Sequence, residues 1–307
     1  MFDFDMPPLD WREARIPKKG KPGQFRKLCI PNDELKEVQR NILQYLYSIK
    51  ALRPSIYAHG FIRHRNTCTG AQRHAKTTEC ILHMDVKDFF DNFPVNVAKE
   101  RLLQANISSS LVEKIMTVCT YKDSFPQGSP CSPCLTNIGM FETDKMLGSF
   151  ADKRGFTYSR YADDIILCLK EGVKAERSSY KHIFIGIDKL LQARLGLHLN
   201  RKKNSVSFMY GRESRAITGV VVRKDGMGYN APMRMRRTAR AMACNLARKL
   251  RAQGGAPRAE DYSSWAKLLG YIRYFDYIRS WSVGDASSAD PIIQEKFFDE
   301  LKEAFAK

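Results

Sequence analysis

The stretch Arg160-Tyr161-Ala162-Asp163-Asp164-Ile165 places two adjacent aspartates between apolar, β-rich flanks that together cover residues 156–169. This pattern predicts a hairpin of two strands with the acid pair at its turn. Two neighbouring carboxylates repel each other, and removing them from water is costly unless a cation neutralises them. The pair therefore indicates a cation site, although a solvated Asp-Asp turn is the simpler interpretation of the pair taken alone.

A third aspartate ends another candidate strand. The short apolar run at residues 80–84 is typical of a buried strand and stops at Asp85, and the pair Phe89-Phe90 follows. Asp88 and Asp91 are also near, but the strand-end position favours Asp85. Hard divalent cations such as Mg²⁺ take carboxylate oxygens and substrate phosphates together. Three converging aspartates could hold two such ions roughly 3.5 to 4 Å apart for phosphoryl transfer.

The composition points to a polyanionic partner. The 307 residues include 51 lysines and arginines against 33 aspartates and glutamates, a net charge of +18, and 43% are hydrophobic. This apolar content excludes a mainly disordered or collagen-like chain. The positive charge favours nucleic acid as the partner, with solubilising surface charge as the alternative.

The cellular environment is also constrained by the sequence. No apolar run approaches the roughly 18 to 20 residues needed to cross a bilayer, and the start lacks a basic segment followed by an apolar one. The eight cysteines are too few for a disulfide framework, so we expect a cytoplasmic protein without a membrane partner. Cys131 and Cys134 have zinc-ligand spacing, but no second ligand pair follows, so we assign them to a loop.

Periodicity and turn signals predict the order of elements. We expect a basic hairpin over residues 16–26, strands at 80–84, 197–209 and 215–222, and helices at 33–50, from 94, and at 110–120, 132–148 and 175–195. Asp225-Gly226 is a further hairpin signal. After about residue 229 only basic helices are expected. The sequence thus predicts a basic β/α lobe, a β-α-β-β core and a helical tail.

Four motifs occur in the order in which reverse transcriptases carry them. Residues 160–165 resemble the YxDD signature of that family, and Asp85 with Phe89-Phe90 resembles its upstream palm motif. Residues 125–133, with the sequence FPQGSPCSP, resemble the PQGxxxSP loop, and residues 199–203, LNRKK, resemble the later lysine-bearing motif. The resemblance runs from about residue 18 to 222 and is weaker in the tail. It implies an α/β (α+β) right-hand polymerase fold with fingers (1–80), a palm (81–228) and a helical thumb (229–307).

The resemblance also implies metal and acid–base roles. Asp85 and Asp163 would be the main metal ligands, with the Val86 carbonyl and Asp164 completing the set for two Mg²⁺ ions, for which Mn²⁺ is a possible substitute. Lys203 could protonate or stabilise the leaving pyrophosphate.

Further residues match the positions that bind the incoming dNTP. Phe90, five positions after Asp85, matches the steric gate that excludes a 2′-hydroxyl, although core packing is the alternative. Gln127 and Gly128 lie where a backbone must approach the base pair and nucleotide closely, which glycine permits. Arg26 matches a residue that neutralises the triphosphate, together with one of the hairpin-tip lysines, Lys18, Lys19 or Lys21, any of which could equally be solvated.

Two segments narrow the resemblance to retron-type reverse transcriptases of prokaryotes. Residues 60–74, ending in Gly70-Ala71-Gln72-Arg73-His74, resemble the NAxxH region, with Gly70 in place of the asparagine and His74 as an implied RNA contact. Ile217-Thr218-Gly219 resembles the VTG motif. A retron type implies a cognate non-coding RNA, partly copied into single-stranded DNA (msDNA) from an internal 2′-hydroxyl, and anti-phage defence with an effector or toxin protein.

Two alternatives remain open. One is a defence-associated reverse transcriptase that is not a retron, because such enzymes share the palm motifs. The other is a catalytically silent RNA-binding scaffold, against which the intact Asp85, Asp163 and Asp164 argue.

The tail has the composition of an RNA-binding helix. Residues 233–251 contain no acid and carry the basic residues Arg234, Arg236, Arg237, Arg240, Arg248, Lys249 and Arg251. Met235, Met242, Leu246 and Leu250 are interspersed, so a helix here would have a core face and a phosphate face. Such a helix would grip RNA through its phosphates and shape rather than its base edges, while about half of the arginines could be merely solvated.

Overall fold

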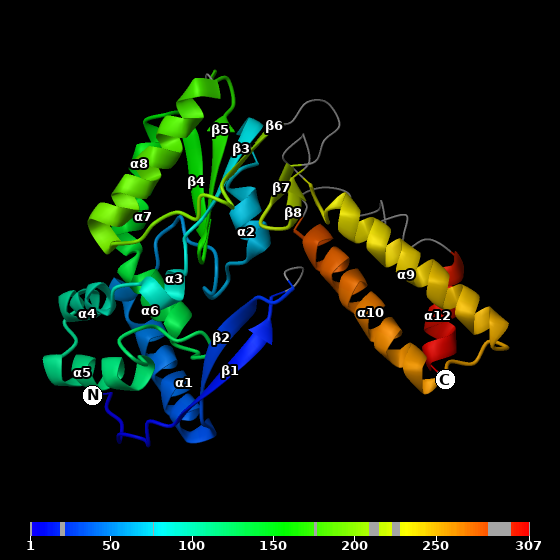
Figure 1. Ribbon diagram of the computed structural model, residues 1–307, viewed down its shortest axis with the longest axis horizontal. Helices are drawn as coiled ribbons and strands as arrows, with labels where there is room; N and C mark the ends of the chain where they lie inside the picture. The colour runs from blue at the N-terminus through cyan, green and yellow to red at the C-terminus, as the bar shows by residue number, and fades with distance from the viewer. Residues whose placement is uncertain are drawn as a thin grey trace. The chain divides into compact units, whose positions relative to one another are not determined.

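The computed structural model describes residues 2–18, 22–75, 77–174, 177–208, 215–222, 228–281 and 296–306 (Figure 1). Lys19, Lys21 and the hairpin signal at Asp225-Gly226 lie outside these residues. The chain forms two compact units, a first unit of Met1–Asn66 with Thr77–Phe208 and a second unit of Thr67–Lys76 with Met209–Lys307. The two units are defined only by how the chain packs and do not test the division into fingers, palm and thumb. The boundaries at residues 80 and 228 therefore stay a prediction.

A four-stranded antiparallel sheet forms the centre of the first unit. Its order is β4 (Phe156–Tyr161), β5 (Asp164–Lys170), β3 (Thr77–Asp85) and β6 (Ser205–Phe208). The predicted hairpin is confirmed, because Tyr161 pairs with Asp164 across its turn. The strand predicted at 197–209 is wrong over its first part, where the chain makes only a single bridge, between Leu199 and Val86, before β6 begins.

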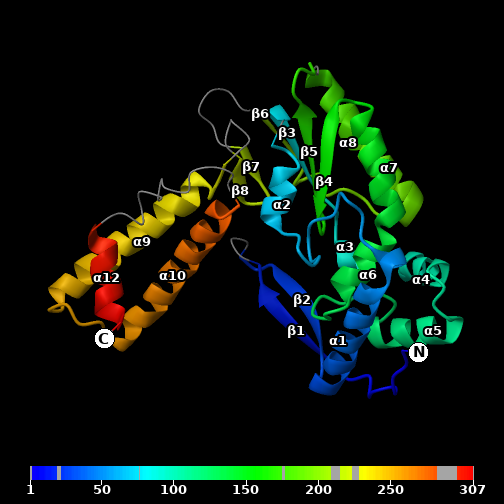
Figure 2. The ribbon, with the colours of Figure 1, turned by 180° about the vertical axis from the view of Figure 1, so that it is seen from behind.

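The other elements of the first unit are mainly helices. They are α1 (Asp33–Ser48), α3 (Phe89–Asn92), α4 (Val95–Gln104), α5 (Ser109–Cys119), α6 (Ser132–Gly139), α7 (Phe141–Asp152) and α8 (Arg177–Leu195), with a short 3₁₀ turn η1 (Lys50–Leu52). In both views α7 and α8 lie along one face of the sheet (Figures 1 and 2). The single helix predicted at 132–148 is in fact two, because the chain breaks at Met140 between α6 and α7.

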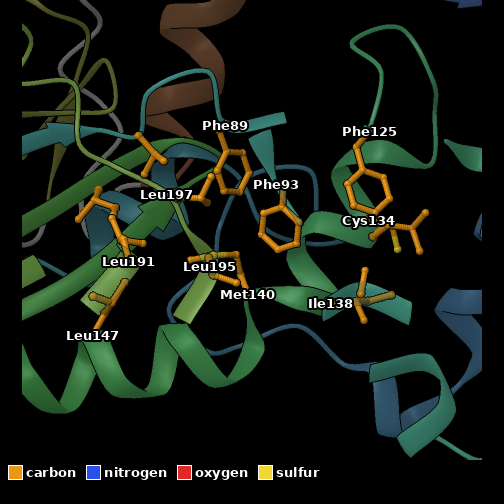
Figure 3. Close-up of a cluster of buried hydrophobic side chains, with 14 of the residues drawn as sticks. Phe89, Phe93, Phe125, Cys134, Ile138, Met140, Leu147, Leu191, Leu195 and Leu197 are labelled. Carbon is orange, nitrogen blue, oxygen red and sulfur yellow. The ribbon is translucent and has the colours of Figure 1, made fainter. Parts of the chain in front are cut away.

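One apolar core joins these elements. Phe89 and Phe93 pack edge to face with ring centroids 5.4 Å apart, and Phe93 in turn contacts Phe125 at the start of the PQG loop. Figure 3 shows these rings beside side chains from α6, α7 and α8, such as Ile138 and Leu191. The loop and the helix α3 that follows Asp85 are therefore fixed by the same core.

A separate two-stranded hairpin precedes α1. β1 (Trp11–Pro17) pairs with β2 (Phe25–Pro31), from Trp11 opposite Pro31 to Pro17 opposite Phe25. The hairpin predicted at 16–26 is confirmed and extends further down both strands. The side chain of Asn32 then caps α1 by accepting a hydrogen bond from the Leu35 amide at 2.8 Å.

The second unit combines a small sheet with helices. β7 (Arg215–Ile217), β8 (Val220–Val222) and β9 (Tyr229–Asn230) form an antiparallel sheet against which α2 (Thr67–Gln72) packs. α9 (Met233–Ala252) and α10 (Ala259–Arg279) run antiparallel, and α12 (Lys296–Ala306) packs on α9 (Figure 2). The predicted basic helix is α9, and its core face is confirmed at Leu246 and Leu250, which are buried, whereas Met235 and Met242 are half-buried.

All eight cysteines are free thiols, and seven of them are buried, whereas Cys244 on α9 is half-buried. Cys131 and Cys134 lie in the core, where the Cys131 thiol donates to the Gln39 carbonyl. None of the helices in the described part of the chain has the length and apolar character needed to cross a membrane.

Candidate active site

The three aspartates lie at one end of the central sheet. Asp85 is the last residue of β3 and Asp164 the first of β5, and they are directly opposite across the antiparallel ladder. Opposed residues in such a ladder project to the same face. Asp163 occupies the turn, and its carbonyl accepts a hydrogen bond from the Val86 amide at 2.9 Å. The backbone itself therefore joins the end of β3 to the turn.

Two of the three carboxylates have a raised pKa. Burial raises the pKa of Asp163, and the neighbouring charge of Asp85 raises it further. The Asp164 side chain is partly exposed at the start of β5, but its loss of hydration within the cluster and the charges of Asp163 and Asp85 raise its pKa to about 6. These shifts express the cost of gathering three negative charges, and a bound cation would relieve that cost.

A lysine already supplies part of the missing positive charge. Lys203 lies 2.5 Å from Asp85 through its Nζ and the carboxylate Oδ2, and the Asn200 amide donates to the Asp85 carbonyl at 2.7 Å. Burial alone would lower the pKa of Lys203, but the hydrogen bond to Asp85 and the charges of the aspartates raise it. Lys203 is therefore a cation at neutral pH.

The carboxylates of Asp85, Asp163 and Asp164 are ligands of the kind that Mg²⁺ requires, but they are not arranged as a metal site in this structure. Among the described residues, no group of three or more His, Cys, Asp or Glu side chains is arranged to hold a metal ion. The Asp85 carboxylate instead accepts a hydrogen bond from Lys203. Three oxygen-donating side chains with an excess of negative charge fit a hard divalent cation in kind.

The loop after α5 is held against the hairpin by a close backbone contact. The Cys29 amide donates to the Gln127 carbonyl at 2.9 Å. Gly128 has a φ of +131°, and a Cβ there would lie 2.5 Å from the Cys29 carbonyl oxygen, so only glycine fits. The Gln127 side chain reaches Asp91 over 3.5 Å, at the limit of a hydrogen bond.

The remaining predicted nucleotide residues lie in the same unit. Phe90 is half-buried and packs edge to face on Phe89 with ring centroids 5.3 Å apart. Arg26 is exposed on β2, and its charge acts to lower the pKa of Asp163, which places it in the field of the acids. Lys18 is exposed at the end of β1, and its amide donates to the Gln24 carbonyl.

The predicted RNA-binding residues belong to the second unit. Arg234, Arg237 and Arg240 are exposed on α9 and Arg236 is half-buried. His74 follows α2 and is fully buried. The side chain of His74 is therefore not accessible in this structure.

Sequence reasoning missed a polar network beneath the acid turn. Arg160 is buried in β4 and bonds to Asp144, Asn137 and the Ala162 carbonyl. The sequence carried no signal for this network, because β4 also contains Thr157 and Ser159 and an arginine among polar residues is usually solvated.

The fold and this arrangement of acids define a nucleic-acid polymerase of the right-hand class. The model of the family described as "Reverse transcriptase (RNA-dependent DNA polymerase)" matches residues 16–244, so this chain belongs to the reverse transcriptases.

Curated relatives of the chain include retron enzymes. The chain is 30% identical over 225 residues to the Retron Ec86 reverse transcriptase of Escherichia coli, covering 71% of this chain and 65% of that one. It is 28% identical over 229 residues to the Retron Mx65 reverse transcriptase of Myxococcus xanthus, covering 67% and 50%. The resemblance to the retron type is confirmed, while the matches span two thirds or less of these relatives.

A solved structure supports the fold alone. A telomerase from Candida albicans, in complex with a TWJ fragment of telomeric RNA, is similar with a TM-score of 0.50 at 11% identity, covering 97% of this chain and 61% of that one.

Proposed function

We propose that this protein is an RNA-directed DNA polymerase of the retron type, which copies part of a cognate structured non-coding RNA into single-stranded DNA. The observation that carries the proposal is the placement of Asp85 opposite Asp164 in the ladder, with Asp163 in the turn and Lys203 on Asp85. Family membership supports the reaction, and the retron relatives support the type.

In this proposal the acids bind metal. Asp85, Asp163 and Asp164 would hold two Mg²⁺ ions, with the Val86 carbonyl as a further oxygen and Mn²⁺ as a possible substitute. When bound, such ions activate the attacking hydroxyl and neutralise charge on the phosphates. Lys203 would hold a proton close to the leaving pyrophosphate, because the aspartates keep its ammonium charged.

The residues around the loop would select and hold the dNTP. Gln127 and Gly128 would place a backbone surface against the nascent base pair, in the geometry that the contact with Cys29 fixes. The Phe90 ring would lie under the sugar and exclude a 2′-hydroxyl. Arg26 and Lys18 would neutralise the triphosphate from the hairpin; Lys19 and Lys21 are the other candidates for that role.

RNA binding would fall mainly to the second unit. Arg234, Arg237 and Arg240 on α9 are exposed and suited to phosphate contacts, with Arg236 beside them. Because His74 is buried, its part in RNA binding would be to hold α2 in place rather than to touch the RNA.

The retron type further implies a setting. The protein would work in the bacterial cytoplasm with an effector or toxin protein in anti-phage defence. This role is tested by phage plating on cells that carry the whole locus with either the wild-type gene or an Asp163→Ala/Asp164→Ala version. Equal plating on both strains would contradict it.

Sequencing the nucleic acid that co-purifies with the protein is the most direct test of the enzyme itself. A branched RNA–DNA species that is absent from the Asp163→Ala/Asp164→Ala variant would support the proposal. RNA without DNA from the wild-type protein would favour an RNA-binding scaffold, and linear DNA without a branch would favour a reverse transcriptase that is not a retron.

A further inference from the structure

A buried ion pair lies directly beneath the acid turn. Arg160 Nε donates to Asp144 Oδ1 and Arg160 Nη2 to Asp144 Oδ2, both at 2.8 Å, and both side chains are fully buried. The Tyr158 hydroxyl also donates to Asp144 Oδ1. Such a two-pronged contact has fixed geometry. A buried pair seldom stabilises a fold more than apolar side chains of the same volume would, so its presence calls for another reason.

The rest of the guanidinium holds the turn. Arg160 Nη1 donates to the Ala162 carbonyl oxygen at 2.9 Å. Ala162 has a φ of +54°, a left-handed conformation that costs a residue with a side chain about 1 kcal/mol or more. The Ala162 carbonyl and the Asp163 amide form one planar peptide group. Anchoring that oxygen therefore sets the direction in which the chain enters Asp163.

A second anchor reaches the turn from another segment. The Arg160 amide donates to the Tyr57 carbonyl and its carbonyl accepts from the His59 amide, both at 2.8 Å, so residues 57–59 run beside β4. At the next residue, a Cβ on Gly60 would lie only 2.7 Å from the Ala162 nitrogen. Gly60 thus lets the two backbones meet at the turn.

Asn137 on α6 links the two anchors. Its Oδ1 accepts from Arg160 Nη2 at 3.0 Å and its Nδ2 donates to the Gly60 carbonyl at 2.9 Å. α6 begins at Ser132, directly after the loop that carries Gln127 and Gly128. One amide therefore fixes the turn to the helix that follows the nucleotide loop.

We propose that Arg160 is a positioning residue, which with Asp144 and Asn137 holds Ala162 in its left-handed conformation and so preorganises Asp163 and Asp164 for metal binding. This proposal rests on the proposed function only because it takes Asp163 and Asp164 as metal ligands. Groups that orient ligands in this way typically change metal affinity or activity by 10- to 100-fold when they are removed.

The test variant must remove the anchor without leaving a lone buried charge. Arg160→Met alone would strand Asp144 in the core, whereas Asp144→Leu/Tyr158→Phe/Arg160→Met replaces the whole pair with apolar side chains of similar volume. The matched control is Asp152→Asn/Lys170→Gln, which breaks an exposed ion pair at the opposite end of β5. Three properties are compared: melting temperature, amide hydrogen exchange of residues 161–165 without metal, and Mn²⁺ binding by electron paramagnetic resonance.

In the triple variant we expect exchange in the turn to be at least tenfold faster and Mn²⁺ affinity to be 10- to 100-fold lower, with the melting temperature close to wild type. The value of kcat should fall by a similar factor while KM for dNTP changes less than threefold. Wild-type exchange and Mn²⁺ affinity in a folded triple variant would overturn the proposal. So would equally faster exchange along the whole of β3 and β5, because Arg160 would then support the sheet in general.

If the triple variant does not fold, Asn137→Ser removes the amide link alone and should weaken Mn²⁺ binding about threefold; no change would overturn the proposal. Failure of the proposed function looks different. Wild-type protein that neither binds Mn²⁺ nor incorporates dNTP, while the triple variant still exchanges faster in the turn, would overturn the enzymatic assignment and support the anchoring.

Discussion

The acid turn of the first unit and the basic helix α9 of the second both depend on charge, in opposite ways. At the turn, the carboxylates of Asp163 and Asp164 stand with Asp85 at one sheet end, and backbone hydrogen bonds join their segments. On α9, the arginines are spread along the helix and mostly exposed. One region concentrates like charge at a cost, and the other distributes it in water.

The difference predicts two kinds of response to substitution. Groups in one cluster act as a unit, so their effects are large and not additive. Exposed charges along a helix act separately, so each substitution should have a small effect and the effects should add. Substitutions in the two regions test this contrast, and the largest effect is expected at the turn.

Replacing both turn aspartates should reduce synthesis the most. Asp163→Ala/Asp164→Ala should reduce Mg²⁺-dependent dNTP incorporation by at least roughly a thousandfold, the upper range for loss of a preorganised electrostatic group. RNA affinity, measured by filter binding, should stay within a few-fold of wild type because the arginines are intact. Undiminished synthesis by the double variant would show that this turn is not part of the active site.

Substitution of Phe90 should have a smaller effect, a change in the preference for dNTP over rNTP. Phe90→Val should raise the ratio of kcat/KM for rNTP to that for dNTP by about tenfold, the scale of a steric change in a pocket. Phe89→Leu is the matched control, because Phe89 is the neighbouring ring but lies in the core. The control should lower stability and leave the ratio unchanged. If Phe90→Val also leaves the ratio unchanged, Phe90 serves only in packing.

The arginines of α9 should each contribute a few-fold to RNA affinity. The test variant carries Arg234→Gln, Arg236→Gln, Arg237→Gln and Arg240→Gln. For each of these arginines that binds a phosphate in the wild type, its loss should make the negative slope of log K against log salt less steep by about one unit. Lys249→Gln is the control, because Lys249 is engaged by Glu260 and Asp261 at 2.5 and 2.7 Å. A wild-type slope in the fourfold variant would show that RNA binds to another surface, such as the basic hairpin β1–β2.

The smallest expected effect is on stability without metal. Since the pKa of Asp164 is raised to about 6 in the folded protein, the native state binds more protons than the unfolded state between about pH 4 and 6. Stability contributed by this group is therefore lost as pH rises through that window. Asp164→Asn should raise the free energy of unfolding by about 1 kcal/mol at pH 7.5 in EDTA, a value reduced for solvent screening.

The same substitution should have almost no effect at about pH 2.5, where the carboxyl is protonated in both states. Urea unfolding at the two pH values makes the comparison. An equal change at both would attribute the effect to packing rather than to charge.

Local pattern was enough to predict the elements that carry the chemistry. The β4–β5 hairpin and α9 follow from alternation and from helical periodicity around their charges, and both are confirmed. The strand expected from residue 197 failed because the chain turns at Arg201–Lys203 to bring a lysine to Asp85. A turn made for a tertiary contact has no local signature.

The polar network beneath the turn was out of reach for a related reason. Arg160 is an ordinary surface residue by its type, and its partner Asp144 lies 16 positions away on α7. Only the packing of α6 and α7 against the sheet tells a buried arginine from a solvated one. The break at Met140, which separates those helices, was missed because apolar residues continue across it.

Thiol reagents should modify the cysteines of this protein selectively. Burial raises the pKa of Cys68 to about 11 and also raises the pKa of the Cys29, Cys80, Cys131 and Cys134 thiols, so little reactive thiolate is present at neutral pH. Cys244 is half-buried on the helix proposed to grip RNA. A maleimide dye should therefore attach to α9 in the unmodified protein and report RNA binding without an engineered cysteine.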